Sequence, residues 1–422
     1  MRIRRRSFFE ILLPLIFVYF LGRGTTFVNP LQPTLLEWPI FFVLLGYLFL
    51  NKKLLLYINK GWLVWLALYL TWCLSTNFWS EVPMMSVIKS TLFILVIITM
   101  ISAGSLWVIR FGYARAIDFL FLIMLIAVIS NLAGLNSEAY LHSGIKISGG
   151  LSGNPNNFGF LTVIASSIIF WHLYQTWGNR WYSLLWVLLL LIDVHGLLMS
   201  YSRSAIAAFL CIIYFFLISL SGYKKMIIIC SVLFAMLLSV VLNPIVMVTL
   251  EKSILAHLVK AAGENSVDTQ QMLVTRNKVW QKSYQQAVKG GLSGGGFYVT
   301  IGEHDFSLSH PNAYGREKGN SQLAIMEETG IIGLSLCLLL VISFYIYALK
   351  CYRFLKLREK KVAMGLVLGL ISGLLAESLV EAWWDSLGPE VFCFWASIGV
   401  AFGMIYLENR ERLVRNTRWL KD

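Results

Sequence analysis

The chain carries little charge for its length. Asp, Glu, Lys and Arg make up 14% of its 422 residues, whereas 58% of the residues are hydrophobic. Soluble domains rarely combine so many apolar residues with so few charged ones, so this composition argues against a soluble globular protein. Several apolar runs approach the roughly 20 residues that cross a bilayer as a helix. Because the runs are continuously apolar rather than alternating, they predict an all-α polytopic membrane protein and not a β-barrel.

The chain is also poor in the spacings that bind metals or cofactors. Its six cysteines include no Cys-x-x-Cys pair, and its histidines show no metal-ligand spacing. Most cysteines fall inside apolar runs, where free thiols behave as small hydrophobic side chains. No ATP-binding motif and no internal repeat is present. We therefore predict a protein that uses no metal and no cofactor, and that lacks the repeated halves of many transporters.

The apolar runs predict about twelve membrane-spanning helices when they are scanned with a window of about 20 residues. The first run follows a basic N-terminus, as in a signal peptide, but no small-residue cleavage site follows it. We therefore expect a retained first helix. The expected spans are 8–22, 37–50, 61–78, 84–104, 115–134, 157–176, 181–199, 204–221, 225–243, 323–349, 362–380 and 390–407.

Positive charge is distributed unevenly among the connecting segments. With the N-terminus in the cytoplasm, most of the 35 Lys and Arg residues fall in cytoplasmic segments, as the positive-inside rule requires. The outside segment Ser75–Pro83 contains none. The net charge of +13 is then explained by topology and by contact with anionic membrane lipids, and we expect no nucleic-acid partner. Both termini are expected in the cytoplasm.

One connection is far longer than the others. Residues 244–322 form an outside loop between the ninth and tenth expected helices, and this loop divides the chain into 1–243, 244–322 and 323–422. Loops of this length are often functional. Within it, Val267–Gly290 has the pattern of an amphipathic helix. Its expected apolar stripe consists of Met272, Val279, Tyr284 and Val288.

Arg203 is the sharpest single signal, because it lies in a very short outer turn between two expected helices. A charge at membrane depth costs about 2.5–3.5 kcal/mol on insertion scales, so this arginine either has a partner or a function, or snorkels to the interface. Arg276 and Arg316 lie in the outside loop, where a solvated position is the simpler interpretation. As a set, the three guanidinium groups match the oxygens of a diphosphate.

Three smaller groups of residues have two interpretations each. Asn154 and Asn156 either cap the following helix, which is favoured, or hold a sugar hydroxyl. The run Gly294–Gly296 either cradles phosphate or forms a turn, and the turn is favoured because no strand precedes it. A third group consists of Glu377, Glu381 and Asp385, whose spacing places them on one helix face. These acids either pair with the arginines, which is favoured, or bind a cation.

The segment SLSHPNAYGREKGNSQLAIMEETG (Ser307–Gly330) gathers polar residues at the mouth of the tenth expected helix. Candidate general bases here are His310, Glu317 and Glu328, since a positioned base adds roughly 10²–10⁴-fold to the rate of a proton-transfer step. For His310, a solvated loop position is an equal alternative. Asn320 is a candidate for positioning a substrate.

These motifs, in this order, resemble the O-antigen ligase and polymerase superfamily. The most specific piece is Glu-x-Gly-x-x-Gly, and the resemblance covers most of the chain, including the long loop. The motifs are SYSRSA (Ser200–Ala205), Arg276 with Trp280, Gly294–Gly296, and GNSQLAIMEETGIIGL (Gly319–Leu334), with the turns Trp79–Pro83 and Gly150–Gly159.

The resemblance implies a membrane-embedded helical fold of the kind called GT-C, in the bacterial inner membrane, with a periplasmic active face. Such enzymes move a glycan from an undecaprenyl-diphosphate carrier to an acceptor hydroxyl without nucleotide or metal. The acceptor is another carrier-linked unit in polymerases and the lipid A core in ligases. Arg203 and Arg276 match the arginines that hold the diphosphate. Membrane lipids and polysaccharide export proteins are the further expected partners.

The chain departs from the ligase pattern at one position. Ligases show a histidine directly before the asparagine of the GNSQ element, whereas Gly319 precedes Asn320 here. The departure favours a surface-polysaccharide polymerase over a ligase and leaves His310 as the nearest histidine. Two other classes stay open, a flippase for lipid-linked oligosaccharides and a scaffold subunit of an export complex. The flippase is disfavoured because the polar chemistry gathers on one outer face.

Overall fold

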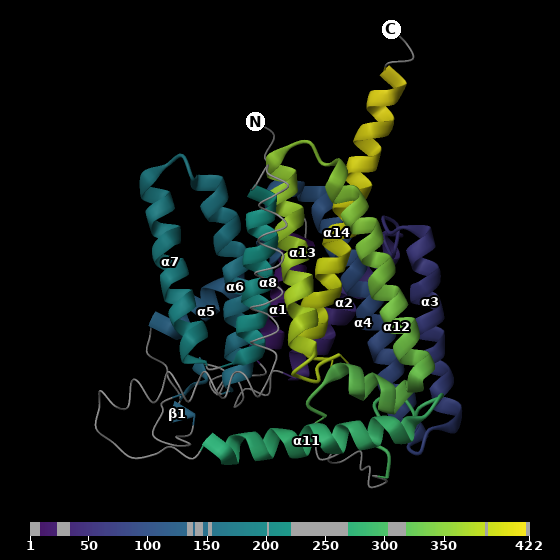
Figure 1. Cartoon of the computed structure of the whole chain (residues 1–422). Helices are drawn as coiled ribbons and strands as arrows, with labels where there is room; N and C mark the ends of the chain where they lie inside the picture. Colours follow the sequence, from purple (N-terminus) through teal and green to yellow (C-terminus); the bar gives the residue numbers. More distant parts are fainter. Residues whose placement is uncertain are drawn as a thin grey trace, which may run out of the picture.

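The computed structural model describes residues 9–22, 34–132, 138–139, 147–150, 154–200, 202–220, 269–302, 318–384 and 387–418. In this part of the chain, long helices stand side by side as a bundle, and one helix lies across an end of it (Figure 1). Strands are limited here to an antiparallel pair of two residues each, β1 (Glu138–Ala139) and β2 (Ile147–Ser148).

The helices follow the apolar runs of the sequence closely. The bundle contains α1 (Phe9–Gly22), α2 (Thr34–Leu50), α3 (Lys60–Ser75), α4 (Pro83–Phe111), α5 (Phe121–Leu132), α6 (Pro155–Thr176), α7 (Arg180–Met199), α8 (Arg203–Leu220), α12 (Ser321–Phe354), α13 (Arg358–Ser378) and α14 (Pro389–Arg418). The crossing helix is α11 (Thr269–Gly290), and short 3-10 turns are η2 (Thr76–Trp79), η3 (Tyr113–Arg115) and η4 (Asp118–Leu120).

The length and composition of these helices are those of a polytopic α-helical membrane protein. Within the described residues, eight helical segments are long and apolar enough to cross a membrane, and Trp38–Leu50 is a shorter apolar helix. Every expected span except 225–243 coincides with a helix. The span expected at 225–243 lies outside the described residues.

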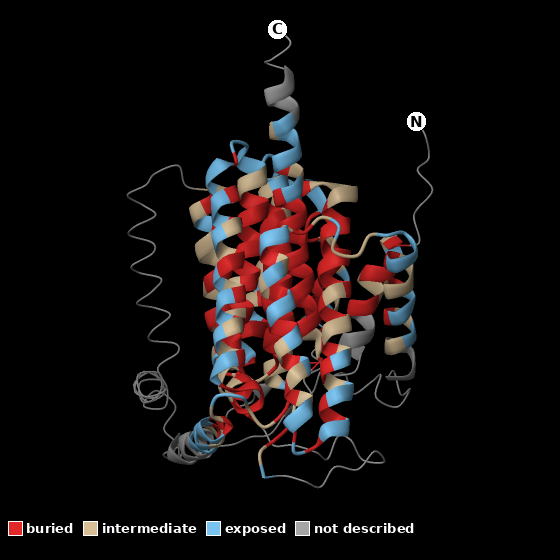
Figure 2. Ribbon diagram, turned by 90° about the vertical axis from the view of Figure 1, so that its right-hand side faces the viewer, coloured by how far each residue is buried: buried red, intermediate tan, exposed pale blue. Residues whose placement is uncertain are grey.

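Small residues let the central helices approach closely. Helix α4 packs along α14, and α8 packs along α13. In the first pair, Gly104 faces the backbone of Ala396, and in the second, Gly369 faces Ile212. Helix association inside a membrane depends on such close packing, because lipid supplies no hydrophobic driving force. Figure 2 shows the buried residues concentrated in the middle of the bundle.

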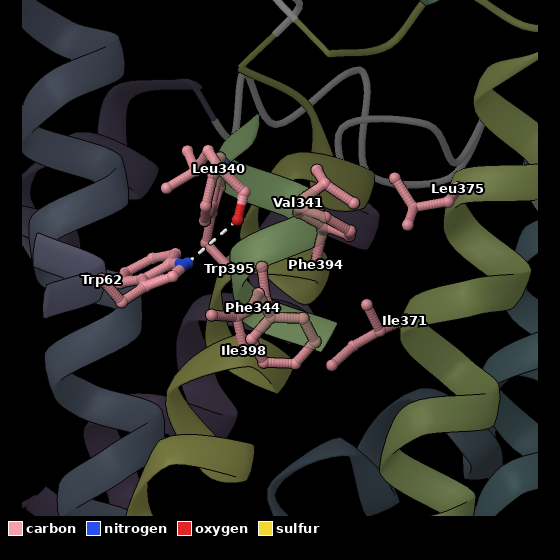
Figure 3. A pocket seen from close by; sticks show the side chains of 9 residues that line it. All are labelled: Trp62, Leu340, Val341, Phe344, Ile371, Leu375, Phe394, Trp395 and Ile398. Carbon is pink, nitrogen blue, oxygen red and sulfur yellow. Dashed lines mark hydrogen bonds between the residues drawn. The ribbon is translucent and has the colours of Figure 1, made fainter. Parts of the chain in front are cut away.

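The interior beside α12 is apolar. Side chains from α3, α12, α13 and α14 converge there (Figure 3). The hydrogen bond drawn in that view runs from Trp62 Nε1 to the Leu340 carbonyl, at 3.1 Å. The remaining lining side chains are hydrocarbon or aromatic. This part of the interior therefore offers no charged side chain to a substrate.

The two ends of the bundle differ in charge. We call the end where α14 finishes the basic end, and the end crossed by α11 the α11 end (Figure 1). At the basic end, cationic side chains cluster with the acidic residues of α14, as in the contacts of Lys360 with Glu408 and Glu411. The cations at the helix ends and turns of this end are Lys52, Lys53, Lys60, Arg110, Arg115, Arg180, Lys350, Arg353, Lys356, Arg358, Lys360, Lys361, Arg410 and Arg412.

Helix α12 is interrupted where the loop after α11 docks against it. Gly330 has φ 71° and ψ −175°, which break the helix. The loop fills the break, because the amides of Gly295 and Gly296 donate to the carbonyls of Glu327 and Glu328 at 2.9 and 3.0 Å. The Ile331 amide donates in turn to Gly291 at 3.0 Å. Backbone groups freed by the break thus find partners, as a membrane segment requires.

Candidate functional site

The polar residues of the GNSQ element hold the point where the chain leaves α13. We call residues 377–384 the α13 exit. Asn320 Nδ2 donates to the Leu379 carbonyl at 2.7 Å, and Ser321 Oγ donates to the Glu381 carbonyl at 2.9 Å. Gln322 Nε2 donates to Ser378 Oγ at 2.8 Å. The start of α12 and the end of α13 therefore form one hydrogen-bonded unit at the α11 end.

The start of α6 reaches the same place. Asn156 Nδ2 donates to Glu381 Oε1 at 2.8 Å. Asn154 is the N-cap of α6, and its side chain accepts from the Asn156 amide at 2.9 Å. The cap interpretation of Asn154 is confirmed, since Asn is a favoured residue at this position. Asn156 instead holds the carboxylate of a residue 225 positions away.

Arg203 begins α8 beside the same turn. A Cβ on Gly373 of α13 would lie 2.8 Å from the Ala208 carbonyl of α8, and one on Gly369 would meet Ile212. Helices α8 and α13 are therefore antiparallel, with Gly369 opposite Ile212 and Gly373 opposite Ala208. One step of four residues further, the last turn of α13 at Glu377 lies level with Arg203 and Ser204 at the start of α8. The predicted residues Asn156, Arg203 and Asn320 thus lie near the α13 exit, the two asparagines by hydrogen bonds and Arg203 by the register of α8 against α13.

One carboxylate of this cluster is almost fully buried. Glu377 is 2% exposed, and its Oε2 has no hydrogen-bond partner among the described residues. The charged groups acting on it are Glu390, at the start of α14, and Glu381. Gln322 Oε1 likewise has no partner among the described residues. The expected pairing of these acids with arginines stays a prediction, and the described contact of Glu381 is the hydrogen bond from Asn156.

Glu328 lies in a buried ion pair. Lys318 Nζ contacts its Oε1, and the Tyr298 amide donates to its Oε2 at 2.8 Å. The Glu328 side chain is 1% exposed and that of Lys318 is 8% exposed. Both oxygens are therefore engaged in fastening the loop to α12. Catalysis by Glu328 stays a prediction, and its described contacts are structural.

The glycine run also has a structural role. The amides of Gly294, Gly295 and Gly296 donate to the carbonyls of Gly290, Glu327 and Glu328, at 2.8–3.0 Å. An amide that already donates to a carbonyl is not available to a phosphate oxygen. The turn interpretation of this run is confirmed, and the phosphate-cradle alternative is wrong.

Gly319 has a backbone conformation and neighbours that disfavour the histidine expected at this position in ligases. Its φ is +63°, and a Cβ there would lie 2.9 Å from Val279 Cγ1 and 3.2 Å from Trp280 Cδ1. Side chains rarely adopt this left-handed region. A histidine at this position would be strained, and its Cβ would press on Val279 and Trp280 of α11. The close packing of α11 therefore favours glycine here.

Helix α11 confirms the amphipathic segment but not its expected stripe. Tyr284 and Val288 are 63% and 52% exposed, whereas Ser283 and Ala287 are buried. Ser283 Oγ donates to the Lys318 carbonyl. Small residues face the bundle because α11 packs closely against backbone, which a stripe of bulky side chains would prevent.

The other predicted residues are not described. His310, Arg316, Glu317 and Asp385 lie outside the described residues. Arg276 belongs to α11, but its side chain also lies outside them. In the residues that are described, no group of His, Cys, Asp or Glu has the arrangement of a metal site.

Sequence reasoning missed two residues of the cluster. These are Ser321 and Gln322, which follow Asn320 in the GNSQ element. Their signal was three successive polar residues, Asn-Ser-Gln, directly at the start of an apolar helix. Sequence reasoning also missed Asp193, which is 1% exposed in α7 and accepts from Ser166 Oγ at 2.5 Å. An acidic residue inside an apolar run was the available signal.

The chain matches no protein-family model and no curated protein. The functional argument therefore rests on the residues of the site.

Proposed function

We propose that this protein is a membrane-embedded glycosyltransferase of the O-antigen ligase and polymerase kind, acting as a surface-polysaccharide polymerase. Its fold is then a twelve-helix GT-C arrangement in the bacterial inner membrane, with the α11 end in the periplasm. The observation that carries the proposal is the cluster at the α13 exit. There, Arg203, Asn156 and Asn320, which the motifs assign to a single site, lie around one turn of helix.

The charge at this place suits a diphosphate. Helices α6, α8 and α12 all begin at the α11 end. Each helix start carries a partial positive charge and amides that favour an anion. Arg203 is the first residue of α8 and adds a full charge with a planar fork. Leaving-group charge that develops on a carrier diphosphate would be stabilised here, which is usually the largest catalytic contribution.

The reaction also fits a site at a membrane mouth. The acceptor hydroxyl attacks the anomeric carbon of the donor sugar, and the carrier diphosphate departs. Because the diphosphate ester is already activated, the transfer needs no nucleotide. Carrier-linked donor and acceptor both have their isoprenoid chains in lipid, so their sugars meet at the surface where the α13 exit lies.

Replacement of Arg203 tests the diphosphate contact. Arg203→Ala and Arg276→Ala should each lower kcat with carrier-linked oligosaccharide by about 10²–10³-fold, the usual loss of a group that stabilises transition-state charge. Arg180→Ala is the matched control, because Arg180 is also the first residue of a helix but lies at the basic end. Wild-type turnover in both test variants, at equal amounts of folded protein, would eliminate the diphosphate contact.

The product decides between the enzyme classes. Purified protein in vesicles would receive carrier-linked oligosaccharide, with or without lipid A core. A lengthened glycan on the carrier supports the polymerase, and glycan on lipid A core identifies a ligase. Absence of both products would refute glycosyl transfer.

One observation favours a transporter as the second candidate. Asp193 is buried in α7, and its Oδ1 has no hydrogen-bond partner among the described residues. Acidic residues inside membranes often carry protons in transporters. A proton-driven flippase would move carrier-linked oligosaccharide across vesicles, and Asp193→Asn would stop that movement. A glycosyltransferase with the same variant would keep its transfer activity.

A further inference from the structure

The last turn of α13 contains a carboxylate with incomplete hydrogen bonding. Glu377 is 2% exposed, and its Oε2 has no donor among the described residues. A buried polar atom without a partner costs about 1–3 kcal/mol. Such atoms are few in native proteins, and those that persist call for an explanation such as a ligand or a catalytic role.

The surroundings of Glu377 are arranged for a ligand rich in donors. Gln322 lies across the same turn, where its Nε2 is used by Ser378 and its Oε1 has no donor among the described residues. Glu381 and Glu390 are the charged groups acting on Glu377. Oxygen-bearing side chains of α12, α13, α14 and the α13 exit therefore lie near the last turn of α13. Sugar hydroxyls are the donors that such acceptors bind.

The residues at the edge of the cluster are only partly buried. Asn156, Asn320 and Glu381 are partly exposed, whereas Glu377 lies behind them. Asn156 fixes Glu381 from α6, and Asn320 fixes the exit from α12. Arg203 stands level with the same turn on α8. A sugar that enters past the side chains of Asn156 and Asn320 would therefore have Glu377 on one side and Arg203 on another.

We infer that Glu377 accepts the proton of the acceptor hydroxyl and that Gln322 and Glu381 bind neighbouring hydroxyls of the acceptor sugar. This inference rests on the proposed glycosyl transfer. In the step, the hydroxyl oxygen forms a bond to the anomeric carbon while its proton moves to Oε2 of Glu377. The bond from the anomeric carbon to the diphosphate oxygen breaks, and its electron pair leaves with the diphosphate. Glu377 then releases its proton to water.

The conservative variant Glu377→Gln keeps the shape of the side chain and removes the proton acceptor. With saturating donor, its kcat should fall about 10²–10⁴-fold, the usual contribution of a general base. KM for the carrier-linked donor should stay within about twofold, because the diphosphate contacts are unchanged. The wild-type rate should fall towards acidic pH, and this limb should be missing in the variant. Glu377→Asp should recover part of kcat.

The matched control is Glu359→Gln, an exposed glutamate in the first turn of the same helix at the basic end. It should turn over as the wild type does. Thermal unfolding in detergent separates a folding defect from a catalytic one. Equal kcat in wild type and folded Glu377→Gln would overturn the role of Glu377 and leave the glycosyl transfer standing. Should Glu377→Gln fail to fold, a Glu377→Asp variant with wild-type kcat and pH profile would also overturn it. Absence of product from the wild type would refute both.

Discussion

Asn320 makes two hydrogen bonds with different consequences. Its Oδ1 accepts from the Leu323 amide at 2.9 Å and so caps α12, while its Nδ2 donates to the Leu379 carbonyl. The cap is local chemistry, and an asparagine before an apolar helix indicates it. The second bond joins segments 59 residues apart. One side chain thus both starts a helix and positions the α13 exit.

Lys318 and Glu328 should act as a structural pair. Lys318→Met leaves the carboxylate buried without its cation, which costs about 3–5 kcal/mol in buried pairs. We expect a lower midpoint of thermal unfolding for Lys318→Met and for Glu328→Gln. Combining Lys318→Met with Glu328→Leu should restore much of the loss, since an apolar pair leaves no buried charge.

A catalytic Glu328 would behave differently. Glu328→Gln would then keep its unfolding midpoint and lose turnover, and the double variant would be folded but inactive. Measuring both quantities on the same preparations distinguishes the two roles. A stable, inactive Glu328→Gln would contradict the structural assignment.

At the scale of elements, the interruption of α12 joins the loop after α11 to the bundle. The sequence predicts a continuous helix over 323–349, whereas the helix spans Ser321–Phe354 with a break at Gly330. Trp72 Nε1 donates to the Thr329 carbonyl at 2.8 Å and so satisfies a group near the break. The Glu-x-Gly-x-x-Gly element is therefore a docking point for the loop within the helix.

Gly330→Ala should undock this loop. A Cβ at Gly330 would collide with the Leu292 carbonyl, and the backbone conformation there is confined to glycine. The conformational strain alone costs about 1–3 kcal/mol. We expect a lower unfolding midpoint and faster proteolysis between α11 and α12.

Gly46 in α2 provides the matched control. A Cβ there meets no atom within 4 Å. Gly46→Ala should leave the protein unchanged or stabilise it by about 0.5–1 kcal/mol, because alanine loses less conformational freedom in a helix. Equal unfolding midpoints for Gly330→Ala and Gly46→Ala would contradict the docking role.

At the scale of the whole molecule, the ends of the bundle carry different chemistry. The basic end gathers most of the described lysines and arginines, whereas the α11 end carries the α13 exit with Glu377 and Glu381, and the crossing helix α11. By the positive-inside rule we expect the basic end to face the cytoplasm. With the proposed location in the inner membrane, the α13 exit would then face the periplasm.

Thiol labelling in intact cells tests this orientation. Phe78 is 91% exposed between α3 and α4 at the α11 end, and Trp177 is 75% exposed between α6 and α7 at the basic end. A membrane-impermeant maleimide should label Phe78→Cys and not Trp177→Cys. The described native cysteines are buried, and the unmodified chain measures any remaining background. The reverse pattern would invert the proposed topology.

By itself the sequence determined where the helices lie, which end is basic and which residues cap helix starts. These properties depend on runs of apolar residues, on charge counts and on neighbours a few positions away. Only the tertiary structure decided that Glu328 is paired with Lys318 and that the amides of Gly294–Gly296 donate to carbonyls. It also decided that small residues of α11 face the bundle. Finally, it left one oxygen of Glu377 and one of Gln322 without a hydrogen-bond donor among the described residues. Each depends on partners far along the chain, and no local pattern specifies which distant group will fill a side chain's remaining hydrogen bond.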